Sequence, residues 1–283
     1  MKLNHSSIPT VSLESQMERL AMEAEFLANM IDTFRNVVPS LTTKLFDAGI
    51  QIKSYFEDTK TARDIKTTHY SLAKKTAHVN FTDYRHILVS VPEGFNGDML
   101  GYSKLLNRMS PEMYKELNDV LIQYNFILSG FISNKEDKLS LQDHTALFKK
   151  TQNHREALIA QVDPFFSADS DQSKMKLGTF IDRFADIAPL VSEVLKLEKI
   201  HSEQNVAELK RSVDKCVDLL KIISDGTANS NIANVSGPVA KNISIGAYEI
   251  GKYVEFMAAI RFRVNQVLST TLTTLTTLDQ AIK

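Results

Sequence analysis

Apolar residues recur at alternating steps of four and three along two long stretches of the chain. In the first, from Leu13 to Tyr55, every position reached by these steps is apolar. A 3.5-residue repeat keeps one face of a helix against a partner helix, so the pattern predicts a long helix with a coiled-coil seam. Pro39 is expected to kink this helix or to begin a second one in the same direction. The seam positions expected to mediate self-association here are Leu13, Met17, Leu20, Leu27, Ile31 and Phe34.

The second stretch, from Ile243 to Ile282, keeps the same register with two polar exceptions, Arg261 and Thr271. A lone polar residue in a seam can set register or partner number at some cost in stability. We expect Arg261 to act in this way, with snorkelling to solvent as the alternative. Neither seam should remain in water, so the two helices are expected to share one bundle, with closure within or between chains left open. The self-association positions named in this seam are Val254, Met257, Arg261, Val264 and Leu268.

A third apolar stripe runs from about Phe180 to Ile223, and its frame slips across the polar stretch 199–205. Asp225-Gly226 is expected to end this helix, because glycine accepts the left-handed conformation found at helix ends. The residues from Thr227 to Pro238 are rich in Asn, Ser, Gly and Ala, which predicts a loop or a flexible hairpin.

The middle of the chain has weaker signals. Residues 79–91 are the one expected strand, Ser110-Pro111 is expected to start a helix, and Ser140–Val162 is expected to form another. The fold class is therefore predominantly all-α, an elongated bundle or coiled coil with at most a minor strand element near 79–91. The chain divides into 1–58, a long N-terminal heptad helix; 59–175, a basic connector with a short strand and two helices; and 176–283, a C-terminal helical hairpin.

Composition narrows the functional classes. Hydrophobic residues make up 43% of the 283 residues and the formal net charge is −1. This near-neutral charge argues against attraction of the whole protein to nucleic acid or to an anionic membrane. The single cysteine, Cys216, excludes an internal disulfide and is expected to be a buried structural thiol. We expect no signal peptide and no transmembrane segment.

Few residue patterns suggest chemistry. Glu198 and His201 have the Glu-x-x-His spacing of a di-metal centre, but the sequence has no second Glu-x-x-His, which such a centre needs. Asp83 and His86 have the same spacing in a weaker helical context. Ser71/Lys74 and Ser212/Lys215 match Ser-x-x-Lys without its companion elements. We therefore expect a solvated helix face at Glu198, and no catalytic residue, cofactor or metal ligand. An enzyme with a metal site at Glu198 and His201 stays an alternative.

Two further alternatives concern partners. The segment 60–86 mixes basic and aromatic residues, as a nucleic-acid patch does, although a solvated connector is favoured. A membrane-active protein similar in outline to helical pore-forming toxins would need an apolar hairpin. The nearest segments, Val120–Ile132 and Thr227–Ala259, are both polar for that role.

Three short segments resemble virion structural proteins of large tailed bacteriophages: Thr10–Gln16, Val37–Leu41 and Val91–Gly94. The resemblance implies a helical, non-enzymatic protein of head, neck or tail that is present in many copies. It carries over no binding residue. With the seams, it leads to the expectation of a homo-oligomer that also contacts other virion proteins and is found in the virion and the host cytoplasm.

Overall fold

The structure is a computed structural model that describes residues 59–132, 141–166, 173–202, 204–228 and 237–282. It confirms the predominantly helical fold with a minor two-stranded antiparallel sheet. The seam from Leu13 to Tyr55, and its packing beside the C-terminal helix, lie outside the described residues. The elements are α2 (Thr59–Lys75), β1 (Leu88–Ser90), α3 (Met99–Ile132), α4 (Leu141–Val162), β2 (Lys174–Lys176), α5 (Ile187–Ser202), α6 (Gln204–Ala228) and α7 (Gly237–Ala281).

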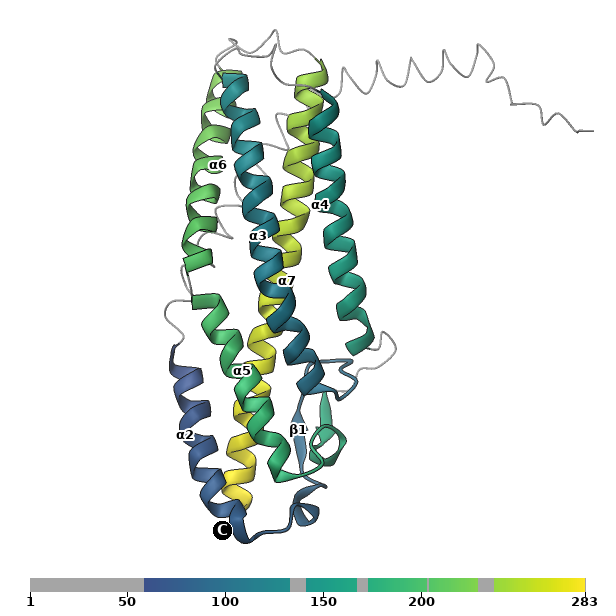
Figure 1. Ribbon diagram of the computed structural model, residues 1–283, viewed down its shortest axis with the longest axis vertical. Coiled ribbons are helices and arrows are strands. Elements are labelled where there is room, and N and C mark those ends of the chain that lie inside the picture. The colour runs from purple at the N-terminus through teal and green to yellow at the C-terminus, as the bar shows by residue number, and fades with distance from the viewer. Residues whose placement is uncertain (1–58, 133–140, 167–172, 203, 229–236, 283) are drawn as a thin grey trace, which may run out of the picture.

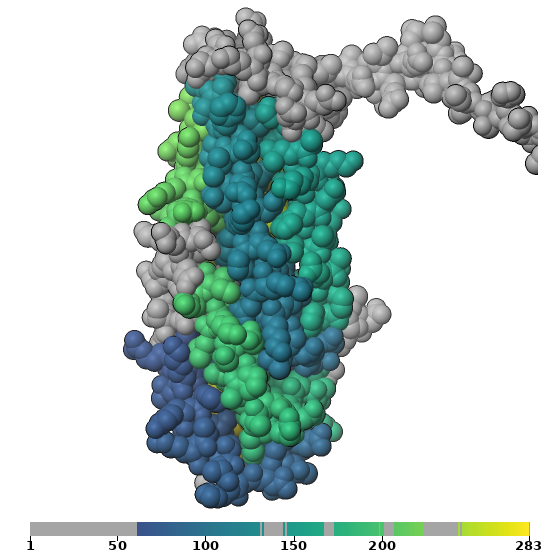
Figure 2. Space-filling model, viewed as in Figure 1, coloured from purple at the N-terminus to yellow at the C-terminus, as the bar shows by residue number. Residues whose placement is uncertain are grey.

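The helices lie nearly parallel to one long axis (Figure 1). α3 runs up the body and α4 runs back down beside it, while α5 and α6 follow one another upward on the other side of α3. α7 then runs down the full length, and α2 lies against its lower part. With 45 residues, α7 is about 68 Å long at 1.5 Å per residue. Figure 2 shows the resulting rod-like body. In Figure 1, one end of the body holds the small sheet and the other the upper turns of α3, α4, α6 and α7.

One hydrophobic core extends through the bundle, from Ile65 on α2 to Ile282 at the end of the described chain. Close approach of α7 to α3 and α4 depends on Gly246. A Cβ atom placed there would lie 2.5 Å from Cζ of Phe148 and 2.6 Å from Cε2 of Tyr124. Those two rings meet edge to face, with centroids 6.1 Å apart. A side chain at position 246 would push the three helices apart.

The helix expected to start at Ser110-Pro111 instead begins at Met99, so that prediction was wrong by about three turns. Asp98 provides the start, because its Oδ1 accepts a hydrogen bond from the backbone N–H of Gly101 over 2.8 Å. Pro111 lies inside the helix. The buried stripe continues on both sides of it, with Met109 and Met113 both fully buried. Packing of this stripe outweighs the one backbone hydrogen bond that proline removes.

The strand expected near 79–91 is present but covers only Leu88–Ser90, paired with Lys174–Lys176. Much of the preceding stretch forms 3₁₀ turns at Thr76–His78 and Phe81–Tyr84. Phe81 is buried against Phe184, with ring centroids 5.0 Å apart, so its apolar character serves a turn and not a strand. Val89 and its partner Met175 are the inward-facing residues of the two short strands.

The slip in the third stripe coincides with a break between two helices, α5 and α6, at residue 203, which lies outside the described residues. Helix α5 begins at Ile187, later than Phe180, because residues 177–186 contain two 3₁₀ turns. Helix α6 continues past Gly226 to Ala228. The loop expected over Thr227–Pro238 was therefore wrong at both ends, where Thr227 and Ala228 belong to α6 and Gly237 and Pro238 to α7. Residues 229–236 lie outside the described residues.

An aromatic cluster ties the connections at the foot of α3 and α4 together. The ring of Tyr102 lies 5.1 Å from that of Phe165, 5.3 Å from that of Phe166 and 5.9 Å from that of Phe95, between centroids. The guanidinium carbon of Arg263 on α7 lies 4.1 Å from the Phe166 ring centre, a cation–π distance. The cluster therefore joins the start of α3, the residues after α4 and the middle of α7.

Candidate functional site

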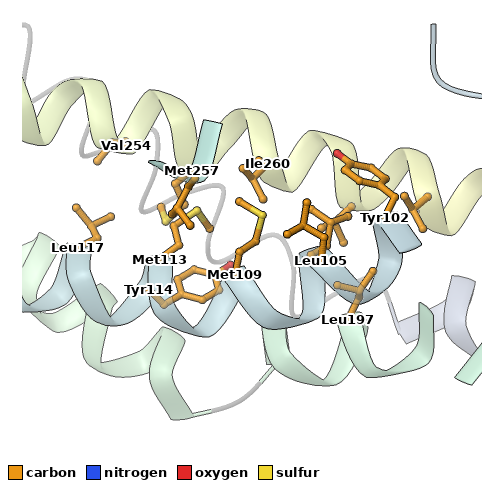
Figure 3. Close-up of a cluster of buried hydrophobic side chains, with 14 of the residues drawn as sticks. Tyr102, Leu105, Met109, Met113, Tyr114, Leu117, Leu197, Val254, Met257 and Ile260 are labelled. Atoms are coloured by element: carbon orange, nitrogen blue, oxygen red, sulfur yellow. The ribbon is translucent and has the colours of Figure 1, made fainter. Parts of the chain in front are cut away.

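The C-terminal seam lies inside the chain's own bundle. Val254, Met257 and Val264 are 3%, 1% and 1% exposed, and Leu268 is half-buried. Figure 3 shows Val254, Met257 and Ile260 of α7 facing Met109 and Met113 of α3. The sequence left open whether this seam packs within one chain or between chains. In the structure, the seam packs within its own chain. The six N-terminal seam positions named above lie outside the described residues.

Arg261 occupies a seam position at only 4% exposure, so it does not snorkel to solvent. It has at least one hydrogen-bonding, ring or electrostatic interaction within the protein, as the cost of burying an unpaired guanidinium requires. The residue therefore belongs to the interior of the bundle.

A polar belt crosses the interface of α3, α4 and α7. We define it as Glu116, Thr151, His154, Arg155, Glu249 and Tyr253. The His154 and Tyr253 rings are stacked, with centroids 6.0 Å apart and planes 7° from parallel. Nδ1 of His154 lies 2.9 Å from the hydroxyl of Tyr253, at hydrogen-bond distance. Burial raises the pKa of Tyr253, and the carboxylates of Glu116 and Glu112 raise it further. The phenol therefore stays protonated, and its O–H can donate a hydrogen bond to Nδ1 of His154.

Charged groups complete the polar belt. Nη1 of Arg155 lies 3.2 Å from Oε2 of Glu249, and the two side chains are 14% and 12% exposed. Glu116 accepts a hydrogen bond from Thr151 Oγ1 over 3.3 Å and pairs with the exposed Lys150 over 3.5 Å. Each of these contacts joins two different helices. The polar belt thus fixes the register of α4 against α3 and α7.

A second set of polar contacts joins α3 to α5 and α6. Ser212 Oγ donates to Asn118 Oδ1 over 2.7 Å, and Asn125 Nδ2 donates to the Ser212 carbonyl over 2.9 Å. Asn107 donates to both the carbonyl and the carboxylate of Glu193, over 2.8 and 2.9 Å. The hydrogen bond from Lys196, and then that from Asn107, lowers the pKa of the Glu193 carboxyl against the opposing effect of its burial. These asparagines set the register of α3 against its other neighbours.

Sequence reasoning missed both sets of contacts. His154 and its partner Tyr253 are 99 residues apart in the sequence. Arg155 and Glu249 are 94 residues apart. No short sequence motif predicts contacts between residues so far apart. These polar residues lie on helix faces that are otherwise apolar. Because a buried polar residue needs a partner, this position could have predicted that each of them makes a contact.

The residues singled out for chemistry do not converge in the described structure. Asp83 and His86 are both exposed. The hydroxyl of Ser71 is hydrogen-bonded to Asp279, and that of Ser212 to Asn118. The side chains of Glu198 and His201 lie outside the description. Among the described residues, no group of three or more His, Cys, Asp or Glu side chains is placed to hold a metal ion. Cys216 is a free, fully buried thiol whose pKa is raised by burial, as its place on an apolar stripe predicts.

The basic segment 60–86 has several of its charges engaged. Lys75 Nζ lies 3.2 Å from Oδ1 of Asp279 on α7. Lys74 lies over the ring of Tyr70, and Arg85 lies 3.9 Å from Asp182. Arg63 and Lys66 are exposed. The charges are thus divided between contacts within the fold and its solvated outer face.

Comparisons of the chain with known protein families, with curated proteins and with solved structures found no match. None of the helices in the described part of the chain combines the length and the apolarity needed to span a bilayer.

Proposed function

We propose that this protein is a non-enzymatic structural component of a bacteriophage particle, present in many copies and acting through helix–helix association. The observation that carries the proposal is the role of the interior polar groups. His154, Arg155, Glu249 and Tyr253, the residue types from which active sites are built, serve here as contacts between helices. These contacts hold the helices of the rod in one register. Such a rigid rod is suited to a structural role.

The particle assignment draws on the three segments that resemble virion structural proteins. Of these, Val91–Gly94 lies in the described structure, directly after β1, and Val91 continues the sheet by donating its N–H to the Ser173 carbonyl over 3.0 Å. Self-association draws on the N-terminal seam. Its repeat matches that of the C-terminal seam, which the chain uses inside its own bundle.

Quantitative mass spectrometry of purified phage particles tests the proposal. We expect peptides of this protein at many copies per particle, and their retention after particles are washed in high salt. Absence from purified particles, with abundant protein in the infected-cell lysate, would contradict the virion assignment.

A further inference from the structure

The outer face of α2 carries a row of exposed basic residues. Figure 2 shows α2 on the outside of the lower half of the body. The helix packs against α7 and α5, and its apolar residues are buried there: Ala62, Ile65 and Leu72. With 3.6 residues per turn, four exposed residues fall within an arc of about 80° on the other side of the helix. We call them the α2 basic stripe: Arg63, Lys66, Tyr70 and Lys74.

The cations of the segment 60–86 are sorted by the fold. Lys75 lies outside the α2 basic stripe and is held by Asp279 of α7 over 3.2 Å. The one acidic residue of α2, Asp64, lies about 100° around the helix from Arg63 and is also outside the stripe. The stripe therefore contains three positive charges and no negative charge, and all three are exposed.

An exposed aromatic ring lies in the middle of the stripe. Tyr70 is 65% exposed, and Nζ of Lys74 lies 4.3 Å from the centre of its ring, over one face. From Arg63 to Lys74 the stripe extends about 16 Å along the helix. Surfaces that bind single-stranded nucleic acid combine a row of cations, which pair with the phosphates, with aromatic rings on which bases stack. The α2 basic stripe has both components on one helix face.

We propose that the α2 basic stripe binds single-stranded nucleic acid. Arg63, Lys66 and Lys74 pair with backbone phosphates, and the Tyr70 ring stacks against a base. From the sequence alone a solvated connector is favoured. The structure changes this interpretation, because it gathers exposed cations and an exposed ring on one face of α2. The inference goes beyond the proposed function, and its test needs only the purified protein.

A nucleic acid fits the stripe better than an anionic membrane does. A helix that binds a membrane surface inserts an apolar face next to its basic residues. The apolar face of α2 is already used inside the bundle, where Ile65 and Leu72 are 0% and 2% exposed. Thr67 and Ala73, the exposed neighbours of the stripe, are too small to anchor a helix in lipid. Charge pairing and stacking on Tyr70 are therefore the interactions that the stripe offers.

The salt dependence of binding to a labelled oligothymidylate tests the charges. We expect the full-length protein to bind with a log–log salt slope of about −2, because each phosphate contact on a single strand contributes about −0.7. Replacing Arg63 and Lys66 by Gln together should make the slope shallower by about 1.4 and weaken binding at least about tenfold at 0.1 M salt. The control replaces Arg211 and Lys215 of α6, which are equally exposed cations, and should bind within about twofold of wild type.

Two substitutions of Tyr70 test the stacking. Tyr70→Ala removes the ring and should weaken binding by about fivefold or more. Tyr70→Phe keeps the ring and should bind as wild type does. Because all the substituted positions are exposed, circular dichroism and the melting temperature of each variant should match wild type.

Three results would overturn the proposal. The first is a wild-type protein that does not bind oligothymidylate at about 100 μM in low salt, where non-specific binding of this kind is readily measured. The second is an equal loss of binding in the two double variants, and the third is a Tyr70→Ala protein that binds as wild type does. Vesicles containing phosphatidylserine are a further probe. If they bind through Arg63 and Lys66 while oligothymidylate does not, the stripe belongs to a membrane contact and the proposal fails.

Discussion

Arg155 on α4 and Glu249 on α7 form an ion pair of 3.2 Å whose side chains are 14% and 12% exposed. A pair so shielded from water leaves an uncompensated charge when one partner is lost, which an exposed pair does not. This pair and the adjacent His154–Tyr253 contact are two polar links from α4 to α7. They should therefore decide how firmly α4 is held.

Replacing one partner of this pair should destabilise the fold. We expect Glu249→Gln to lower the free energy of unfolding by about 1–3 kcal/mol, because the Arg155 guanidinium loses its counter-charge while largely buried. Chemical denaturation followed by circular dichroism measures this. Lys115→Gln removes the corresponding charge from the exposed Lys115–Asp119 pair and should change the value by less than about 0.5 kcal/mol. Equal effects of the two variants would contradict the role assigned to the polar belt.

Two buried tyrosines should respond in opposite ways to loss of their hydroxyl groups. Tyr124 donates to the Ile243 carbonyl over 2.8 Å, so Tyr124→Phe should cost about 1 kcal/mol. The Tyr102 hydroxyl is buried without a hydrogen-bond partner in the described structure. Tyr102→Phe should therefore be neutral or raise the free energy of unfolding slightly. Thermal melts of the two variants side by side would show the difference, and a larger loss from Tyr102→Phe would refute this account of its surroundings.

Substitution of Gly246 should be poorly tolerated. Gly246→Ala puts a methyl group within 2.6 Å of both the Phe148 and Tyr124 rings, and we expect a loss of about 2–4 kcal/mol through overpacking. Ser269→Ala on the exposed face of the same helix should stay within about 0.5 kcal/mol of wild type. If Gly246→Ala had the same melting temperature as wild type, α7 would not approach α3 and α4 as closely as described.

Acid should remove the contribution of Glu193. Its carboxyl has a pKa below the ordinary value of 4.5, chiefly through Lys196. A carboxyl whose pKa is lower in the folded state stabilises the fold above its unfolded pKa, and this stabilisation is lost as the pH falls through the folded value. We expect wild type to be more stable than Glu193→Gln at pH 7, with the gap closing as the pH falls below about 4.5. A gap independent of pH would mean that the carboxylate charge plays no part.

The sequence predicts the helices far better than it predicts their contacts. The stripe from Ile243 to Ile282 follows from a local repeat and is buried along α7 from Ile243 onward, because packing against the bundle requires the same interval at each turn. The predicted start of α3 at Ser110-Pro111 was wrong. Pro111 is a local signal for a helix start, but the packing of Met109 and Met113 on either side of it outweighs that signal. The polar belt could not be foreseen, because His154 and Tyr253 are brought together only by the tertiary fold.

The central claim is that copies of this chain associate, and the mass of the full-length protein in solution tests it most directly. Sedimentation equilibrium at micromolar concentration should give a mass that is an integral multiple of 31.8 kDa, two or greater. We expect the oligomer to persist on dilution through the low micromolar range, because association along a long heptad seam would bury many apolar side chains. A single species of 31.8 kDa across that range would contradict the account.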